Sequence, residues 1–170
     1  VAPAELVGTA RRRYEVRGSL RLYGLCSVPV VADSGYGGVV TYLADRDGRL
    51  WTVADIMPGG ADRAASAGNL TVALGEAALS HRELGRGGLV VSGATASDAG
   101  TLGAGRAVKA VRAGGAGWAD PPLAGLWAQP VDDQVRRAFA ALAVPVQDRP
   151  AGADLLFLSG RVLGACGDGV

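Results

Sequence analysis

The feature that most limits the possible folds of this chain is a two-residue alternation near its start. Between residues 13 and 23, apolar or small residues hold the even positions and mainly polar residues hold the odd ones. A period of two is the pattern of a β-strand with one buried face. The even set is Tyr14, Val16, Gly18, Leu20 and Leu22, and the odd set is Arg13, Glu15, Arg17, Ser19, Arg21 and Tyr23. We therefore expect a first strand over residues 12–23, bent at Gly18 because a glycine inside a strand often marks a bend or bulge.

A hairpin after this strand is the clearest local signal in the chain. Two short apolar runs, residues 39–44 and 50–55, are joined by residues 45–49, which contain an Asp-Gly pair. That pair favours the positive φ angles of tight hairpin turns. The preceding segment, residues 28–38, is rich in Gly and also holds Pro and Asp, so it predicts a long loop.

Helical signals then interrupt the strands. Residues 61–67 are rich in alanine and predict a short helix. Ser80 and Glu83 have the spacing of a capping box, so we expect a helical turn over residues 81–86. Two more strands are predicted over residues 89–97 and 105–112. The resulting order is that of an OB-like five-stranded barrel over residues 12–115, with a helix between strands 3 and 4.

The rest of the chain is predicted to lie outside this barrel. Residues 1–11 are expected to be a lead-in, and residues 116–150 a linker that contains Pro and Gly, with a short helix over 123–128 and a longer one over 132–143. In the longer helix Val135, Ala138, Phe139 and Leu142 share one face. The apolar run 154–165 predicts a strand of a second, truncated β unit over residues 151–170. The expected fold class is therefore mostly β.

Composition excludes several protein classes. With 170 residues, 49% of them hydrophobic, the chain can bury the core of one ordinary domain. No apolar run approaches the roughly 18–20 residues of a membrane span, and no signal-peptide pattern opens the sequence. We therefore expect a cytoplasmic protein with no membrane partner. Residues 11–21 carry five Arg and one Glu, but 16 of the 17 basic residues are Arg, which we interpret as the composition of a GC-rich genome.

The residues that bind metals or perform catalysis are sparse. Cys26 and Cys166 lie far apart and His81 is the only histidine, whereas structural zinc takes four N or S ligands. Two free, buried thiols are predicted, and a disulfide between them is the alternative. The string GTLGAG at residues 100–105 lacks the Lys of a P-loop and the helix of a dinucleotide site. An enzymatic hypothesis would need a pocket that joins His81 to a carboxylate or to Cys26. We expect no metal, no cofactor, no catalytic residue and no enzymatic activity.

One set of residues suggests a ligand. Barrel proteins bind single-stranded nucleic acid by stacking bases on aromatic rings and following the backbone with cations. The outer face of the first predicted strand offers Arg17, Arg21 and Tyr23, and the neighbouring hairpin offers Tyr42 and Trp51. We therefore predict a non-enzymatic module that binds single-stranded nucleic acid through these five residues. Two alternatives stay open: Trp51 fits equally well in a core, and the same groove fits a protein partner, which would make the chain a protein-interaction or scaffold module without nucleic-acid binding.

Four strings lie within residues 18–115, namely LRLYGLCSVPVVADSGYGG, LWTVADIMPGG, LSHRELGRGGLVVSGATAS and GTLGAGRAVKAVRAGG. Over this stretch the chain resembles the non-finger region of bacterial SWIM zinc-finger family proteins. The CxC and CxH pairs that bind zinc in that family are absent, since Cys26 and Cys166 are isolated and no Cys lies two positions before His81. The resemblance therefore implies no zinc ligand here. It implies an accessory region of a larger protein that interacts with DNA or protein.

Overall fold

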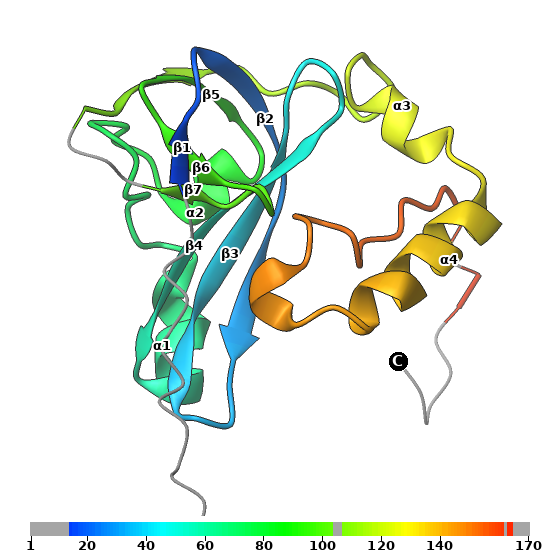
Figure 1. Cartoon of the computed structure of the whole chain (residues 1–170), viewed down its shortest axis with the longest axis horizontal. Coiled ribbons are helices and arrows are strands. Elements are labelled where there is room, and N and C mark those ends of the chain that lie inside the picture. Colours follow the sequence, from blue (N-terminus) through cyan, green and yellow to red (C-terminus); the bar gives the residue numbers. More distant parts are fainter. Residues whose placement is uncertain (1–13, 104–106, 162, 165–170) are drawn as a thin grey trace, which may run out of the picture.

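Two antiparallel sheets organise the chain, whose residues 14–103, 107–161 and 163–164 are described by a computed structural model (Figure 1). The larger sheet has five strands in the order β4-β3-β2-β5-β8, and the smaller sheet has the order β1-β6-β7. The larger sheet contains β2 (Leu20–Val31), β3 (Tyr36–Ala44), β4 (Leu50–Pro58), β5 (Gly88–Ser92) and β8 (Lys109–Ala113). The smaller contains β1 (Tyr14–Val16), β6 (Thr95–Ser97) and β7 (Leu102–Gly103). The mostly β prediction is confirmed.

Short helices interrupt and follow these strands. α1 (Gly60–Ala67) and α2 (His81–Leu84) lie between β4 and β5 in the chain, and α3 (Ala124–Trp127), α4 (Val131–Leu142) and the 3-10 turn η1 (Val146–Asp148) follow β8. Within the described ranges, no pairing joins the edge strands β4 and β8. None of the helices in those ranges has the length and apolarity that crossing a membrane requires.

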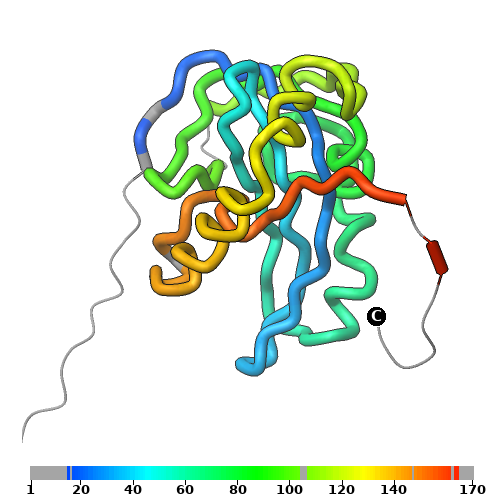
Figure 2. Tube along the Cα trace, turned by 90° about the vertical axis from the view of Figure 1, so that its right-hand side faces the viewer, coloured from blue at the N-terminus to red at the C-terminus, as the bar shows by residue number. Residues whose placement is uncertain are grey.

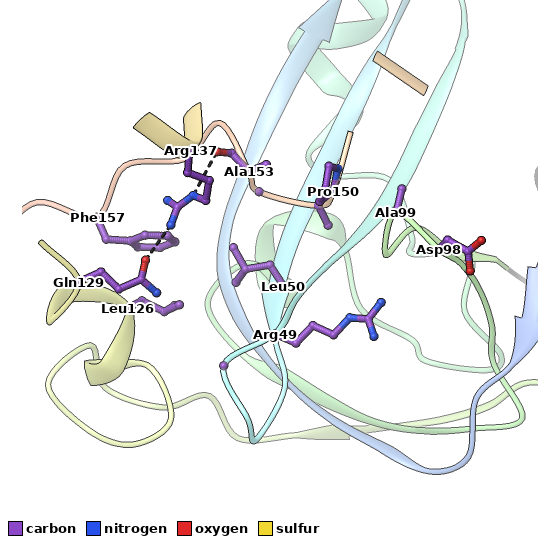
Figure 3. Close-up of a pocket in the computed structure, with 13 residues that line it drawn as sticks. Arg49, Leu50, Asp98, Ala99, Leu126, Gln129, Arg137, Pro150, Ala153 and Phe157 are labelled. Carbon is purple, nitrogen blue, oxygen red and sulfur yellow. Dashed lines mark hydrogen bonds between the residues drawn. The ribbon is translucent and has the colours of Figure 1, made fainter. Parts of the chain in front are cut away.

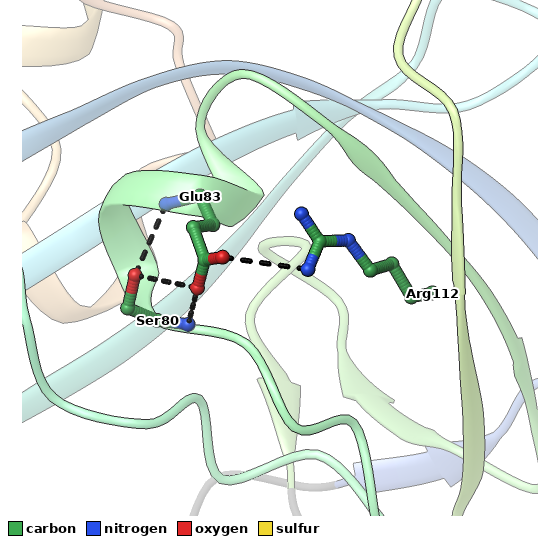
Figure 4. Close-up of polar contacts among 3 residues, drawn as sticks. All are labelled: Ser80, Glu83 and Arg112. Atoms are coloured by element: carbon green, nitrogen blue, oxygen red, sulfur yellow. Dashed lines mark hydrogen bonds and ion pairs between the residues drawn. The ribbon is translucent and has the colours of Figure 1, made fainter.

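The local predictions that depend on turns and caps are confirmed. The turn between β3 and β4 has Gly48 at φ +78°. The capping box is present in both directions: the backbone N–H of Glu83 donates to Ser80 Oγ at 3.2 Å, and the Ser80 N–H donates to Glu83 Oε2 at 2.8 Å (Figure 4). Arg112 of β8 donates to the other carboxylate oxygen at 3.3 Å, which ties α2 to the edge of the sheet.

Several predicted strand boundaries are wrong. The strand expected over residues 89–97 is two strands, β5 and β6, in different sheets, and the described part of the strand expected over residues 105–112 begins only at Lys109. The strand expected over residues 12–23 is two strands in different sheets, because the chain leaves strand geometry at residues 17–19, around Gly18. The loop expected over residues 28–38 is only residues 32–35. The rest of that segment belongs to β2 and β3, whose pairing begins at Val31 opposite Gly37. Gly37 serves close packing here: a Cβ at this position would overlap the carbonyl of Gly60 at the start of α1.

Both faces of the large sheet carry buried clusters of apolar side chains. Its inner face carries the first core cluster, which includes Leu22, Leu43, Trp51 and Leu89. Its outer face carries a second cluster, formed by Leu25, Ala44, Leu123, Leu126 and Phe157. Figure 2 shows α3 and the segment after residue 150 lying across that face. Residues 116–150, predicted as a linker, therefore contribute α3 to the packing of the sheet.

The strand expected over residues 154–165 is wrong for its described part, residues 154–161 and 163–164, which contain no strand. Side chains of α4 form hydrogen bonds with backbone N–H and carbonyl groups of residues 153–157, which in a strand would pair with a neighbouring strand. The Gln134 amide exchanges two hydrogen bonds with the backbone of Phe157, at 2.6 and 3.1 Å. Arg137 donates to the carbonyls of Ala153 and Leu155. Cys166 lies outside the described residues.

Candidate nucleic-acid interface

The structure places Trp51 away from the other predicted site residues. Trp51 pairs with Leu43 across β3 and β4, so its ring points to the inner face, opposite to Tyr42. Its side chain is 2% exposed, and its indole N–H donates to Asp45 Oδ2 at 2.9 Å. A ring in this position cannot stack on a base. The alternative interpretation of Trp51 as a core residue is confirmed.

Arg21, Tyr23 and Tyr42 share the outer face of the sheet but are largely engaged there. The Arg21 guanidinium lies 4.2 Å from the centre of the Tyr23 ring and donates to the carbonyls of Leu22 and Gly114 at 2.7 and 2.6 Å. Tyr42 packs against the second cluster, and burial, with the nearby Asp154 carboxylate, raises the pKa of its phenol. These three side chains therefore serve mainly as packing and tethering groups.

Arg17 lies apart from them, on the connection between the two sheets. Its guanidinium forms an ion pair with Glu15 at 3.5 Å, and its backbone N–H donates to the carbonyl of Ala94. The structure thus brings together three of the five predicted residues and separates Trp51 and Arg17 from them.

A groove follows the edge of β2 beyond Tyr23. β5 pairs with β2 only from Leu20 to Tyr23, and a bulge between Gly24 and Cys26 then bends the strand. Beyond Tyr23 the turn that follows α2 lies beside β2 in place of β5. There the Gly24 N–H donates to the carbonyl of Gly87 at 2.8 Å. The space left beside it is a groove of about 530 Å³. We call it the β2-edge groove.

Two arginines and a tryptophan border the β2-edge groove, while Cys26 and Ser27 lie on its floor. Arg82 and Arg86 are exposed, and neither forms an ion pair within the described part of the chain. Burial raises the pKa of the Cys26 thiol, so it stays neutral at physiological pH. The groove is therefore electropositive.

The third bordering residue, Trp118, is the outer member of an aromatic ladder. Its ring stacks on Trp127 of α3 with centroids 5.6 Å apart and planes at 22°. Trp127 in turn meets the buried Phe157 edge to face at 5.1 Å. Trp118 itself is 66% exposed and also borders a second hollow of about 440 Å³ on the side of α3. The ladder anchors an exposed indole to the second cluster.

His81 lies under the floor of the groove, with no exposed surface. Ser27 Oγ lies 2.6 Å from the His81 carbonyl and 2.8 Å from Thr41 Oγ1, which lies 2.9 Å from His81 Nδ1. A carbonyl only accepts, so Ser27 donates to it, Thr41 donates to Ser27, and His81 Nδ1–H donates to Thr41. Nε2 is then the unprotonated nitrogen. Burial lowers the pKa of His81, although the Asp55 carboxylate opposes this shift, and a neutral, enclosed imidazole has no access to a substrate.

A further concavity lies at the end of the β3–β4 turn and has about 340 Å³ of space (Figure 3). Leu50, Leu126 and Phe157 line it, together with Arg137. The Arg137 guanidinium is already bonded to Gln129 at 2.7 Å and to the Ala153 carbonyl at 3.2 Å (Figure 3). This concavity therefore lies between side chains of the second cluster, and its Arg137 guanidinium is already hydrogen-bonded within the chain.

The residues that form the β2-edge groove and the ladder were missed by sequence reasoning. Trp118 lies in a segment rich in Gly and Pro, where no periodicity assigns it a face. One available signal was the spacing of Arg82 and Arg86, four residues apart beside a capped helical turn. Searches of family models, curated proteins and solved structures gave no match for this chain.

Proposed function

We propose that this protein is a binding module for single-stranded nucleic acid, with the β2-edge groove as its site. The observation that carries the proposal is the exposed Trp118 ring, held against Trp127 at the border of a groove that also presents Arg82 and Arg86. Nucleic-acid strands offer phosphates and unstacked bases side by side. Cations follow the phosphates, and an aromatic ring accepts a base of any sequence.

Stacking supplies much of the expected affinity. Base–aromatic stacking contributes about 1–3 kcal/mol per base in single-strand binding. Because Trp118 already stacks on Trp127, little of its side-chain freedom remains to be lost on binding. The unpaired arginines add an electrostatic contribution that salt screens.

The arrangement of the five main strands supports the same proposal. They follow the order three strands, helices, two strands, which is the order of OB-like barrels, a fold that often binds oligonucleotides. We include in the proposal that the sheet is OB-like. We also propose, with the SWIM resemblance, that the module is an accessory, non-enzymatic region of a larger cytoplasmic protein.

Fluorescence anisotropy with a labelled single-stranded oligonucleotide tests the proposal. Arg82→Ala with Arg86→Ala should weaken binding and should flatten the slope of log K against log salt by about 1.4, because each lost phosphate contact on a single strand removes about 0.7. Trp118→Ala should weaken binding without changing that slope.

The matched control is Arg46→Ala with Arg136→Ala, which removes the same charge from exposed positions away from the groove. It should leave the affinity nearly unchanged. A larger loss from Arg17→Ala with Arg21→Ala than from the groove pair would move the site to the predicted strand face. Absence of binding at low salt would overturn the nucleic-acid proposal itself.

A second candidate function, a protein-interaction module, is supported by a different observation. Phe139 and Leu142 of α4 are 68% and 58% exposed. Large apolar side chains gathered on one exposed helix face are typical of interaction surfaces.

A further inference from the structure

The hollow on the side of α3 adjoins the β2-edge groove, because Trp118 borders both. It has about 440 Å³ of space, and we call it the α3-side hollow. Its lining comes from the two stacked indoles, from Ala119 and Ala124, and from residues 158–160. A strand that is bound in the groove through Trp118 therefore has this hollow beside it.

The groove and the hollow differ in charge. Arg82 and Arg86 border the groove, whereas none of the described residues that line the α3-side hollow carries a charge. A phosphate forms its strong hydrogen bonds with cationic groups, so it is better placed beside the arginines. A nucleobase is neutral and flat, and its apolar surface is removed from water against a wall of Trp, Leu and Ala side chains. The α3-side hollow therefore suits the base of a nucleotide, and the groove suits the phosphates.

Residues 158–160 also offer polar groups that the edge of a base can meet. The residues before them, 153–157, are hydrogen-bonded to side chains of α4. No described residue forms a hydrogen bond with the backbone of residues 158–160. In the recognition of single strands, the edges of unstacked bases are read by hydrogen bonds of this kind. The hollow thus combines an apolar wall with N–H and carbonyl groups at fixed positions.

We propose that the α3-side hollow is a base-selective subsite and that it prefers purines to pyrimidines. This inference rests on the proposed binding of single-stranded nucleic acid. Stacking on Trp118 accepts any base, because every base has an aromatic face. In the hollow the affinity depends on how much of the space a base fills. A purine buries more ring surface against Leu158 and the two indoles than a pyrimidine does.

Fluorescence anisotropy with two labelled strands tests the subsite. One strand is an octathymidylate, and the other carries a single adenine at its centre, which avoids the self-stacking of adenine runs. The wild-type protein should bind the adenine-containing strand about fivefold or more tighter. Equal affinity for the two strands would refute the subsite and leave the proposed function intact. Failure to bind either strand at low salt would refute both.

Filling the hollow tests where the preference arises. Ser159 is exposed, so Ser159→Trp should leave the fold intact while its ring occupies part of the hollow. The preference for adenine should fall below about twofold, and the salt dependence should stay as in the wild type because Arg82 and Arg86 are unchanged. Ser34→Trp, the same substitution in the exposed turn between β2 and β3, should keep the preference. A preference that survives Ser159→Trp would place the selectivity outside this hollow.

A truncation tests the apolar wall without adding bulk. Leu158 is 55% exposed, so Leu158→Ala should cost little stability but should reduce the preference for adenine by about half or more. The matched control is Leu142→Ala, at an α4 residue that is 58% exposed, and it should keep the wild-type preference. Urea midpoints of the variants verify that each one is folded. An equal preference in the two alanine variants would contradict the contact between the base and Leu158.

Discussion

At the scale of single residues, buried His81 makes stability depend on pH. Its pKa is lowered in the folded state by burial, so the unfolded chain binds the proton more readily. Stability is then fully present above the ordinary histidine pKa of about 6.5 and is lost as the pH falls below it. Because His81 is the only histidine, no other side chain ordinarily titrates between about pH 5 and 8.

Urea unfolding at several pH values between 5 and 8 measures this dependence. The wild-type midpoint should fall as the pH is lowered, whereas His81→Asn, which keeps a donor near Thr41 but cannot be protonated, should lose most of the dependence. At pH 8 the variant should be less stable than the wild type by about 1–3 kcal/mol, because it leaves a cavity, and this difference should shrink as the pH falls. An equal pH slope in both proteins would show that His81 is not the titrating group.

At the scale of elements, the side-chain amide of Gln134 connects α4 to the segment that contains Phe157. Gln134 is fully buried and bonds both the N–H and the carbonyl of Phe157. Gln134→Leu should lower the free energy of unfolding by about 1–3 kcal/mol for each backbone group left unpaired. Hydrogen exchange of the Phe157 amide should accelerate in the variant. The control Arg46→Leu, at an exposed position whose side chain makes no hydrogen bond among the described residues, should change stability by no more than about 0.5 kcal/mol. Unchanged Phe157 protection in Gln134→Leu would refute this role.

Elements set by adjacent residues were predictable from the sequence. The β3–β4 turn depends on Asp47 and Gly48, and the start of α2 on Ser80 and Glu83, so each is specified within a few residues. The segment after α4 has an apolar pattern typical of a strand, yet its backbone is bonded by Gln134 and Arg137. Nothing within that segment reveals a partner that lies on another element.

At the scale of the whole molecule, the two sides of the sheet depend on each other. Residues 12–115 were expected to fold as a barrel, but Leu25 and Ala44 of that region are covered by Leu123, Leu126 and Phe157. A chain truncated after residue 115 should therefore expose an apolar face, bind a hydrophobic dye and unfold at a lower urea concentration. Cooperative unfolding at the midpoint of the full chain would show instead that residues 12–115 are an independent domain.

The candidate site was only partly predictable because it is assembled at this largest scale. Alternation along one strand correctly separates Arg21 and Tyr23 from the inner Leu20 and Leu22, but the face that Trp51 takes depends on its register with β3. The β2-edge groove requires β5 to stop pairing at Tyr23 and α2 to take its place. Trp118 comes from a segment far along the chain, and a contact between such distant segments leaves no pattern in the local sequence.

The ladder of Trp118, Trp127 and Phe157 also gives the molecule an optical reporter. Two indoles stacked at 5.6 Å couple their electronic transitions, while Trp51, the third tryptophan, emits from an enclosed environment. Light absorbed by the stacked pair therefore reports on the groove border, and a base placed on Trp118 would quench its emission without silencing Trp51. The side chains of the proposed stacking platform would thus also make its occupancy visible without an added label.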